Sequence, residues 1–232
     1  MEKIAAVCKP EDILERKRAL RREVIARRDA IPEEARRTKS KCVCQRIAEE
    51  FKRVCATKAH PTVAVYAAMS SEVDLEDFIE CAYECGARVA FPCMSKAEQQ
   101  DEDEQGNQQR DKPERNKPPV RPSMVMRSVS HEQYRVQEVP FITSPIRAYA
   151  TNDAAVKNYP SVFPEEVDFA VIPMVAFDDS LMRLGYGGGN YDSFLSKTRS
   201  DAAIIGAAFD EQHVASVPAE DHDLRLPNIA YA

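Results

Sequence analysis

The chain opens with two stretches in which apolar residues recur at helical spacing. Between residues 11 and 30, Leu20 and Val24 fall on one side of a helix, while arginine and lysine fill the other side. A second amphipathic pattern runs from Pro32 to about Val54. These patterns predict a pair of long helices before the first predicted strand.

After the helices, apolar residues gather in short runs rich in β-branched side chains. Four runs predict buried strands, at residues 62–66, 87–91, 169–172 and 203–208. A helical pattern separates the first two runs, and a strand, a helix and a strand at this spacing form a right-handed βαβ unit. We therefore expect an α/β fold, with a Rossmann-like, mostly parallel sheet that carries helices on both faces.

Two stretches interrupt this pattern. Residues 95–122 are rich in charged residues, glutamine and proline and lack apolar periodicity, so they bury too little surface to offset the entropy of ordering. Residues 148–166 contain Pro160 and Pro164 and show no regular periodicity. We expect a single domain over residues 1–232, with a disordered insertion at 95–122 and a surface loop at 148–166.

The overall composition narrows the class of protein. With 232 residues, the chain is long enough for one α/β domain with a sizeable core. The net charge of −6 argues against a nucleic-acid partner, and no apolar run approaches the roughly 20 residues of a membrane helix. We expect a monomer in the cytoplasm. The arginine-rich N-terminus leaves a mitochondrial location as the alternative, although its acidic residues are unusual for a transit peptide.

The 7 cysteines do not form a recognisable metal or disulfide framework. Their number is odd, and neither Cys42 with Cys44 nor Cys81 with Cys85 has a second pair or a nearby histidine that would complete a zinc site. We therefore expect reduced thiols, most of them packed in the interior of a cytosolic protein.

Candidate chemistry concentrates between Arg183 and Asp192. Four of the 7 glycines in the chain lie between positions 185 and 189, after an apolar run and before residues at helical spacing. Backbone amides at a glycine turn before a helix form an anion site, and the guanidinium of Arg183 suits a phosphate. The carboxylate of Asp192 is suited to a magnesium ion beside that phosphate.

Two interpretations of this stretch remain open at the level of the sequence. The common phosphate motifs are absent, because Asn190 and Asp192 stand where a Gly-x-Gly-x-x-Gly pattern needs glycine, and there is no Gly-Lys-Ser/Thr. The first interpretation is a tight turn that lets a helix pack on the sheet. The second is a ligand-binding loop, which three consecutive glycines between an arginine and an aspartate favour.

The same stretch resembles the signature of the 5-formyltetrahydrofolate cyclo-ligases, also called methenyltetrahydrofolate synthetases. The residues that carry the resemblance are Arg183-Leu184-Gly185-Tyr186-Gly187-Gly188-Gly189, then Tyr191 and Asp192, preceded by Pro173, Ala176, Phe177 and Asp178. Weaker similarity to the family occurs at residues 17–21, 72–74, 206–212 and 218–223. The resemblance therefore extends over most of the chain and implies the same α/β fold.

The resemblance also implies a role for individual residues. It assigns ATP binding to Lys17, Arg21, Arg183, Leu184, Gly185, Tyr186, Gly187, Gly188, Gly189, Asn190 and Tyr191, with Lys17 and Arg183 as the catalytic residues. It assigns folate binding to Ala67, Glu72, Tyr186, Gly189, Asn190 and Tyr191, and Mg²⁺ binding to Asp192 and Asp223.

For several of these residues the sequence alone fits a simpler role equally well. Lys17 and Arg21 fit a solvated basic helix face. Glu72 fits a carboxylate at a helix start, where the helix dipole favours it. Asp223 fits a polar surface loop. These alternatives stay open until the structure places the side chains.

The activity that the resemblance implies is the ATP-dependent cyclisation of 5-formyltetrahydrofolate (folinate) to 5,10-methenyltetrahydrofolate. ADP and phosphate are released, through an intermediate in which the formyl oxygen is phosphorylated (an iminophosphate). Folinate and ATP are then the partners, with Mg²⁺ as cofactor. The alternatives are a non-catalytic folate- or nucleotide-binding relative, and another phosphate-binding enzyme on the same fold, such as a sugar-phosphate isomerase.

Two features depart from the family pattern. Many members carry an aromatic residue immediately before the final Tyr-Asp of the signature, and this chain has Asn190 there, which changes the packing expected for a pterin. The chain also ends at Ala232, shortly after Asp223, so the length of its last strand is an open question.

Overall fold

The computed structural model describes residues 10–96, 122–150, 152–220 and 223–232. Most of the predicted insertion at 95–122, namely residues 97–121, lies outside the described residues. The helices of the described residues are α1 (Pro10–Asp29), α2 (Glu33–Cys55), α3 (Glu76–Glu84), α4 (His131–Val136), α5 (Pro140–Thr143) and α6 (Asn190–Leu195), with short 3₁₀ turns η1 (Pro164–Glu166) and η2 (Asp210–Gln212). The predicted pair of long N-terminal helices is confirmed.

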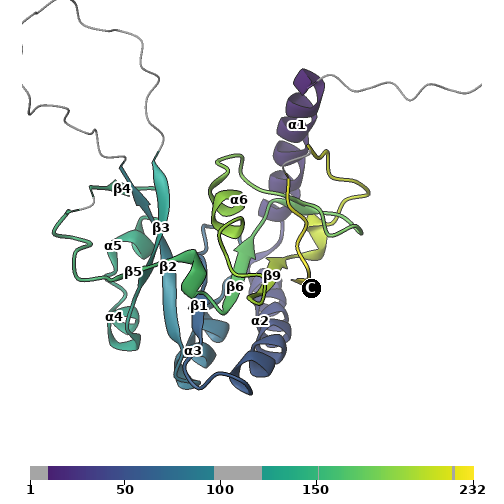
Figure 1. Cartoon of the computed structure of the whole chain (residues 1–232). Helices are drawn as coiled ribbons and strands as arrows, with labels where there is room; N and C mark the ends of the chain where they lie inside the picture. Colours follow the sequence, from purple (N-terminus) through teal and green to yellow (C-terminus); the bar gives the residue numbers. More distant parts are fainter. Residues whose placement is uncertain (1–9, 97–121, 151, 221–222) are drawn as a thin grey trace, which may run out of the picture.

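The strands form one large sheet and one small hairpin (Figure 1). They are β1 (Thr62–Ala64), β2 (Arg88–Ser95), β3 (Ser123–Ser128), β4 (Ala148–Tyr149), β5 (Ser161–Val162), β6 (Phe169–Pro173), β7 (Ala176–Phe177), β8 (Arg183–Leu184), β9 (Ala203–Ala208) and β10 (Ile229–Tyr231). The large sheet has the order β10-β9-β6-β1-β2-β3-β5, with β4 beside β2, and the hairpin is β7 with β8. The strands of the large sheet from β10 to β2 pair in parallel, whereas β3 pairs antiparallel with both of its neighbours, β2 and β5. The mostly parallel sheet is therefore as predicted.

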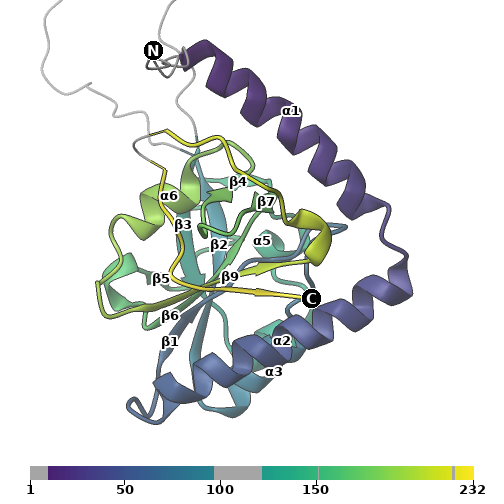
Figure 2. The same ribbon diagram turned by 90° about the vertical axis from the view of Figure 1, so that its right-hand side faces the viewer.

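Each face of the sheet is buried by different helices, because successive side chains of a strand point to opposite sides. Val63, Val89 and Phe169 belong to the core that the sheet shares with α2 and α3. Their neighbours Ala64 and Ala90 belong to the core on the other face, which includes α6. Figure 2 shows α6 on one side of the sheet and α2 and α3 on the other, which confirms helices on both faces.

Residues 148–166, predicted as a surface loop, contribute more than a loop. They supply β4, β5 and η1, and Tyr149 and Val156 are fully buried. The carbonyl of Pro160 accepts a hydrogen bond from the Ser128 amide, which extends the pairing of β3. Two-residue strands are too short to give an alternating pattern, which explains why periodicity did not reveal them.

The end of the chain completes the sheet. Ile229, Ala230 and Tyr231 of β10 pair in parallel with Gly206, Ala207 and Ala208 of β9. The chain therefore supplies an edge strand after Asp223. Within the described residues, none of the helices combines the length and apolar character that crossing a bilayer requires.

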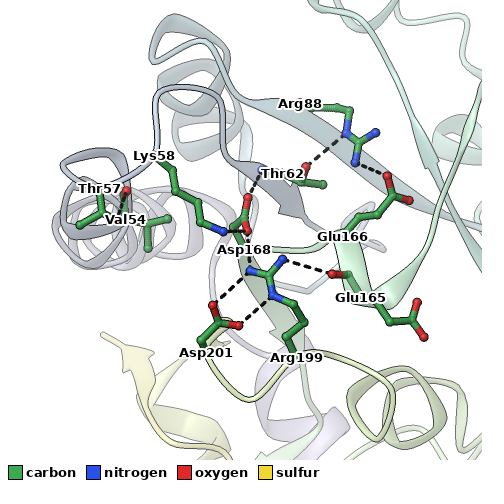
Figure 3. Close-up of polar contacts among 10 residues, drawn as sticks. All are labelled: Val54, Thr57, Lys58, Thr62, Arg88, Glu165, Glu166, Asp168, Arg199 and Asp201. Atoms are coloured by element: carbon green, nitrogen blue, oxygen red, sulfur yellow. Dashed lines mark hydrogen bonds and ion pairs between the residues drawn. The ribbon is translucent and has the colours of Figure 1, made fainter.

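A buried carboxylate joins the N-terminal ends of the parallel strands (Figure 3). Asp168, just before β6, accepts hydrogen bonds from the Thr62 amide at 2.9 Å and from Arg199 at 2.8 Å, and it pairs with Lys58. Arg88 at the start of β2 donates to the Thr62 hydroxyl at 3.2 Å. Burial opposes ionisation of Asp168, but these hydrogen bonds outweigh it and hold the pKa of the carboxyl below its usual value. This cluster fixes where β1, β2, β6 and β9 begin.

Replacing Asp168 by asparagine should lower the free energy of unfolding at pH 7 by about 1–3 kcal/mol, because Lys58 and Arg199 lose a charged acceptor. A depressed pKa stabilises the fold above the unfolded-state value of about 3.9, and this contribution is lost as the pH falls through the folded-state pKa. The deficit of Asp168→Asn, measured by urea unfolding, should therefore narrow below about pH 4. Asp201→Asn, at a largely exposed partner of Arg199, is the control and should change stability by less than about 0.5 kcal/mol. A deficit that does not change with pH would contradict this account.

Candidate active site

A cavity of about 480 Å³ opens beside the end of β6, at the edge where the parallel strands finish. Open α/β sheets bind ligands at this edge. The residues predicted for ATP, folate or Mg²⁺ all line it: Lys17, Arg21, Ala67, Glu72, Arg183, Leu184, Gly185, Tyr186, Gly187, Gly188, Gly189, Asn190, Tyr191, Asp192 and Asp223. The structure thus brings together segments from both ends of the chain, while the individual roles remain predictions.

The glycine loop begins at a small hairpin and ends at a short helix. Arg183 and Leu184 form β8, which pairs with β7, and α6 starts at Asn190. Gly187 has φ +94° and Gly189 has φ +70°, a conformation that glycine adopts without strain. This is the predicted order of strand, glycine turn and helix start.

Helix α1 brings positive charge to the loop. Its Val24 shares a small core with Met182 and Leu184 of the hairpin region, so the helix lies directly against the loop. From this position Arg21 Nε donates to the carbonyl oxygen of Gly185 at 2.7 Å. A Cβ atom at Gly187 would lie 3.3 Å from the Arg21 guanidinium carbon, so glycine leaves the room that this arginine occupies.

Lys17 is buried rather than part of a solvated helix face. Its side chain is 7% exposed, and its ammonium group donates to Glu220 at 2.7 Å and to Asp223 at 2.6 Å. Burial alone would lower the pKa of Lys17, but the hydrogen bonds to these two carboxylates outweigh burial and raise the pKa above its usual value. The solvated-face alternative is therefore wrong for Lys17, whereas Arg18 and Arg22 on the same helix are exposed.

Arg183 contributes a second buried cation. Its side chain is 3% exposed, and Nη2 pairs with Asp192 Oδ1 at 2.5 Å. Burial lowers the pKa of the guanidinium, against the opposing charges of Asp192 and Asp223. The Nε atom is buried without a hydrogen-bond partner among the described residues. A buried donor of this kind is costly unless a ligand satisfies it, and a phosphate oxygen fits that need.

Glu72 belongs to a partly buried chain of hydrogen bonds that the sequence did not reveal. Its Oε1 accepts from the Tyr186 hydroxyl at 2.5 Å, and its Oε2 accepts from the Met69 amide at 2.8 Å. The Tyr186 hydroxyl in turn accepts from Arg28 at 2.8 Å. Burial raises the pKa of Glu72, while its hydrogen bonds and the charge of Arg28 oppose the rise. Arg28 follows Lys17 and Arg21 on one face of α1, and this spacing is the signal that could have identified it.

Part of the cavity lining is apolar, and the sequence did not predict it; we call this part the apolar wall. It is formed by Pro92, Met94, Met124, Pro145, Ile146 and Pro173. Asn190 faces this wall, with its amide nitrogen 3.9 Å from the Met94 sulfur. These apolar residues come from four separate segments, namely β2, β3, the loop after α5 and the end of β6, so no local pattern marks them.

The carboxylates fit a partial magnesium site. In the part of the chain that the structure describes, no group of three or more His, Cys, Asp or Glu side chains is placed to hold a metal. Asp192 and Asp223 both line the cavity, paired with Arg183 and Lys17 respectively. Mg²⁺ is usually bound by one or two carboxylates together with substrate phosphates and water, so two such oxygens beside a phosphate site are a suitable donor set.

Comparisons with known proteins show the family to which the chain is similar. The model of the 5-formyltetrahydrofolate cyclo-ligase family matches residues 13–232. A protein of that name from Haemophilus influenzae is 39% identical over 74 residues, and one from Escherichia coli K12 is 39% identical over 64 residues. These matches cover 31% and 27% of this chain, and 40% and 35% of the relatives. The chain therefore matches less than half the length of these curated relatives.

Solved structures resemble the whole fold. A 5,10-methenyltetrahydrofolate synthetase from Mycoplasma pneumoniae has a TM-score of 0.63 at 18% identity, covering 92% of this chain and 97% of that one. The synthetase from Aquifex aeolicus has a TM-score of 0.59 at 23% identity, covering 93% and 89%. At this identity the similarity establishes the fold alone.

Replacing Glu72 by glutamine should make the variant more stable relative to the wild type at pH 7 than at pH 4, by on the order of 1 kcal/mol. The reason is that the pKa of Glu72 is higher in the folded protein than in the unfolded chain, where it is about 4.3. The wild type therefore loses stability as the pH rises from the unfolded-state pKa through the folded-state pKa. This pH-dependent gain, measured by urea unfolding, should disappear below about pH 4. Glu49→Gln, at an exposed position in α2, is the control and should show no such dependence. A stability difference between variant and wild type that does not change between pH 4 and pH 7 would contradict the raised pKa of Glu72.

Proposed function

The chain belongs to the 5-formyltetrahydrofolate cyclo-ligase family, and we propose that it converts 5-formyltetrahydrofolate and ATP to 5,10-methenyltetrahydrofolate, ADP and phosphate. One observation carries the proposal: Lys17, Arg21 and Arg183 meet the glycine loop in a single cavity, where a buried arginine donor lacks a partner among the described residues. These three residues, which we call the cationic wall, suit an anionic group of high charge. The monomeric state and the cytoplasmic location remain predictions from the sequence.

The proposed chemistry needs little covalent help from the protein. A formamide oxygen is a poor leaving group, so the γ-phosphoryl group of ATP is first transferred to it, with release of ADP. The N10 amine of the same folate then attacks the formyl carbon and closes the ring. The C–O bond breaks, phosphate departs with the oxygen, and the N10 proton is lost. Because both nucleophiles belong to the substrate, the enzyme acts by positioning and charge stabilisation.

We assign the phosphate work to the cationic wall. Arg183 and Lys17 stabilise the phosphoryl group during transfer, while Arg21 and the amides of Gly187 to Gly189 hold the rest of the triphosphate. Lys17 presently bonds to Glu220 and Asp223, so nucleotide binding exchanges carboxylate oxygens for phosphate oxygens. A lysine suits this exchange because its charge lies at the end of a flexible stem.

We assign the folate to the other side of the cavity. The buried carboxylate of Glu72 accepts hydrogen bonds from the pterin, beside Ala67, Tyr186 and Tyr191. The apolar wall with Met94 and Met124 packs against the ring, and Asn190 offers it an amide in place of an aromatic side chain. Polarisable methionine side chains adapt well to a flat heterocycle.

Magnesium completes the proposal. Asp192 and Asp223 would hold the ion directly or through water, and the ion would neutralise charge on the phosphate oxygens. The aspartates would then exchange their present pairs with Arg183 and Lys17 for the metal.

The activity is tested by mixing the purified protein with 5-formyltetrahydrofolate, ATP and magnesium and recording the absorbance of the methenyl product. Turnover that requires both ATP and magnesium is expected. A protein that binds folate and nucleotide without turnover would instead be a non-catalytic relative. Turnover of a sugar phosphate without ATP would indicate another enzyme on the same fold.

Replacing Lys17 by methionine should reduce kcat by on the order of 10²–10³, because a charge that stabilises the transferring group is lost while the apolar stem remains. Arg22→Met is the matched control on the exposed side of the same helix, and it should keep nearly full activity. Thermal melting of both variants checks the fold. Unchanged kcat in a folded Lys17→Met protein would remove this lysine from the catalytic machinery.

A further inference from the structure

Arg28 is a buried cation that lies behind the cavity wall rather than on it. It is 4% exposed, and it comes from the face of α1 that also carries Lys17 and Arg21. Its Nε donates to the Ser71 hydroxyl at 3.0 Å, and its Nη1 donates to the Tyr186 hydroxyl at 2.8 Å. The Ser71 hydroxyl in turn donates a hydrogen bond to the Asp29 carboxylate. Arg28 thus has two acceptors, Ser71 and Tyr186, on two different loops. Arg28 therefore joins the segment around Glu72 to the glycine loop.

The bond from Arg28 determines how the Tyr186 hydroxyl is used. A hydroxyl has one proton to donate, and an incoming bond from a guanidinium leaves that proton free to point elsewhere. Here it points to Glu72 Oε1 at 2.5 Å, while the Met69 amide holds Oε2 at 2.8 Å. Both oxygens of the carboxylate are thereby fixed in direction. The guanidinium carbon also lies 5.8 Å from the centre of the Tyr186 ring, which keeps the ring in place.

We infer that Arg28 is a positioning residue that acts through Tyr186 to hold the Glu72 carboxylate in the orientation that receives the folate. The inference rests on the proposed function, because it concerns the substrate of that reaction. It separates Arg28 from its neighbours on α1: Lys17 and Arg21 contact the phosphate side of the cavity, whereas Arg28 serves the folate side.

The charges around Glu72 predict how the loss of Arg28 would change the pH dependence of kcat/KM. The titratable groups that face Glu72 are Arg28 from α1, Tyr186 from the glycine loop, Tyr66 after β1 and Tyr191 from α6. Arg28 is the cation among them, and its charge favours the ionised carboxylate. Removing that charge raises the pKa of Glu72, so the acidic limb of the pH profile of kcat/KM moves to higher pH.

The experiment compares five variants with the wild type: Arg28→Met, Arg28→Lys, Tyr186→Phe, the double variant Arg28→Met with Tyr186→Phe, and the control Arg27→Met. Arg27 neighbours Arg28 on the exposed side of the helix, where it pairs with Glu23 at 3.7 Å. In Arg28→Met, KM for 5-formyltetrahydrofolate should rise about 10- to 100-fold, the worth of a charge-assisted hydrogen bond, while KM for ATP changes less than about threefold. Arg27→Met should match the wild type.

The other variants test that the effect passes through Tyr186. Arg28→Lys keeps the charge but loses the guanidinium, which donates to Ser71 and Tyr186 at once. Its acidic limb should therefore lie at the wild-type pH, while its KM for folate should fall between those of the wild type and Arg28→Met. Tyr186→Phe should raise the folate KM and move the acidic limb upward, because Glu72 loses its hydroxyl donor. Combined with Arg28→Met, it should add little, since residues that act in one chain are not additive.

The outcomes separate this inference from the proposed function. Wild-type protein that does not turn over 5-formyltetrahydrofolate overturns the proposed function. With wild-type turnover present, an unchanged folate KM and pH profile in Arg28→Met overturns the role of Arg28. Equal rises in both KM values also overturn it, because they indicate general loss of structure. Fully additive effects with Tyr186→Phe overturn it as well, because they show that the two residues act independently. If Arg28→Met does not fold, as judged by thermal melting, the same tests are read from Arg28→Lys and Tyr186→Phe.

Discussion

The structure depends on holding three cationic side chains close together at one cavity, two of them buried and Arg21 half-buried. Lys17, Arg21 and Arg183 repel one another and lose hydration at the cavity wall, which is a large cost for unpaired charges. The protein meets this constraint with acceptors of its own: carboxylates for Lys17 and Arg183, and a backbone carbonyl for Arg21. The positive charges at the cavity are thus balanced by acceptors that belong to the protein itself. An incoming polyanion competes with side chains already present, so its net gain is the difference between two sets of contacts.

The backbone around the site provides the rigidity that this exchange needs. Gln212 is almost fully buried, and its amide donates to the carbonyls of Met174 and Val175, which lead from β6 into the hairpin. Asp178 caps the same hairpin by accepting from the amides of Ser180 and Val217. The hairpin that precedes the glycine loop is therefore held rigidly, so ligand binding requires changes only in the side-chain hydrogen bonds around the loop. Pre-formed donors of this kind stabilise developing charge without reorganisation.

The parts of the fold and site that the sequence predicted are those with local causes. A glycine turn needs positive φ at Gly187 and Gly189, so composition alone marked it, and amphipathic spacing marked the long helices. The remaining parts depend on distant contacts. Whether Lys17 is solvated or buried is decided by Asp223, which lies 206 positions away, and the apolar wall exists only because separate elements meet. The pairing of β4 and β5 likewise comes from tertiary context, since two residues carry no period.

The joining of the two ends of the chain at one site has a consequence for biosynthesis. Lys17 bonds to Glu220 and Asp223, and the backbone amide of Asp210, the first residue of η2, donates to the carbonyl of Ala232. During translation the first helix emerges long before its partners exist. Contacts of such large sequence separation form late and slow the overall folding rate. On the ribosome, therefore, Lys17 lacks the carboxylates that pair with it in the folded protein until the segment that carries Glu220 and Asp223 has been synthesised.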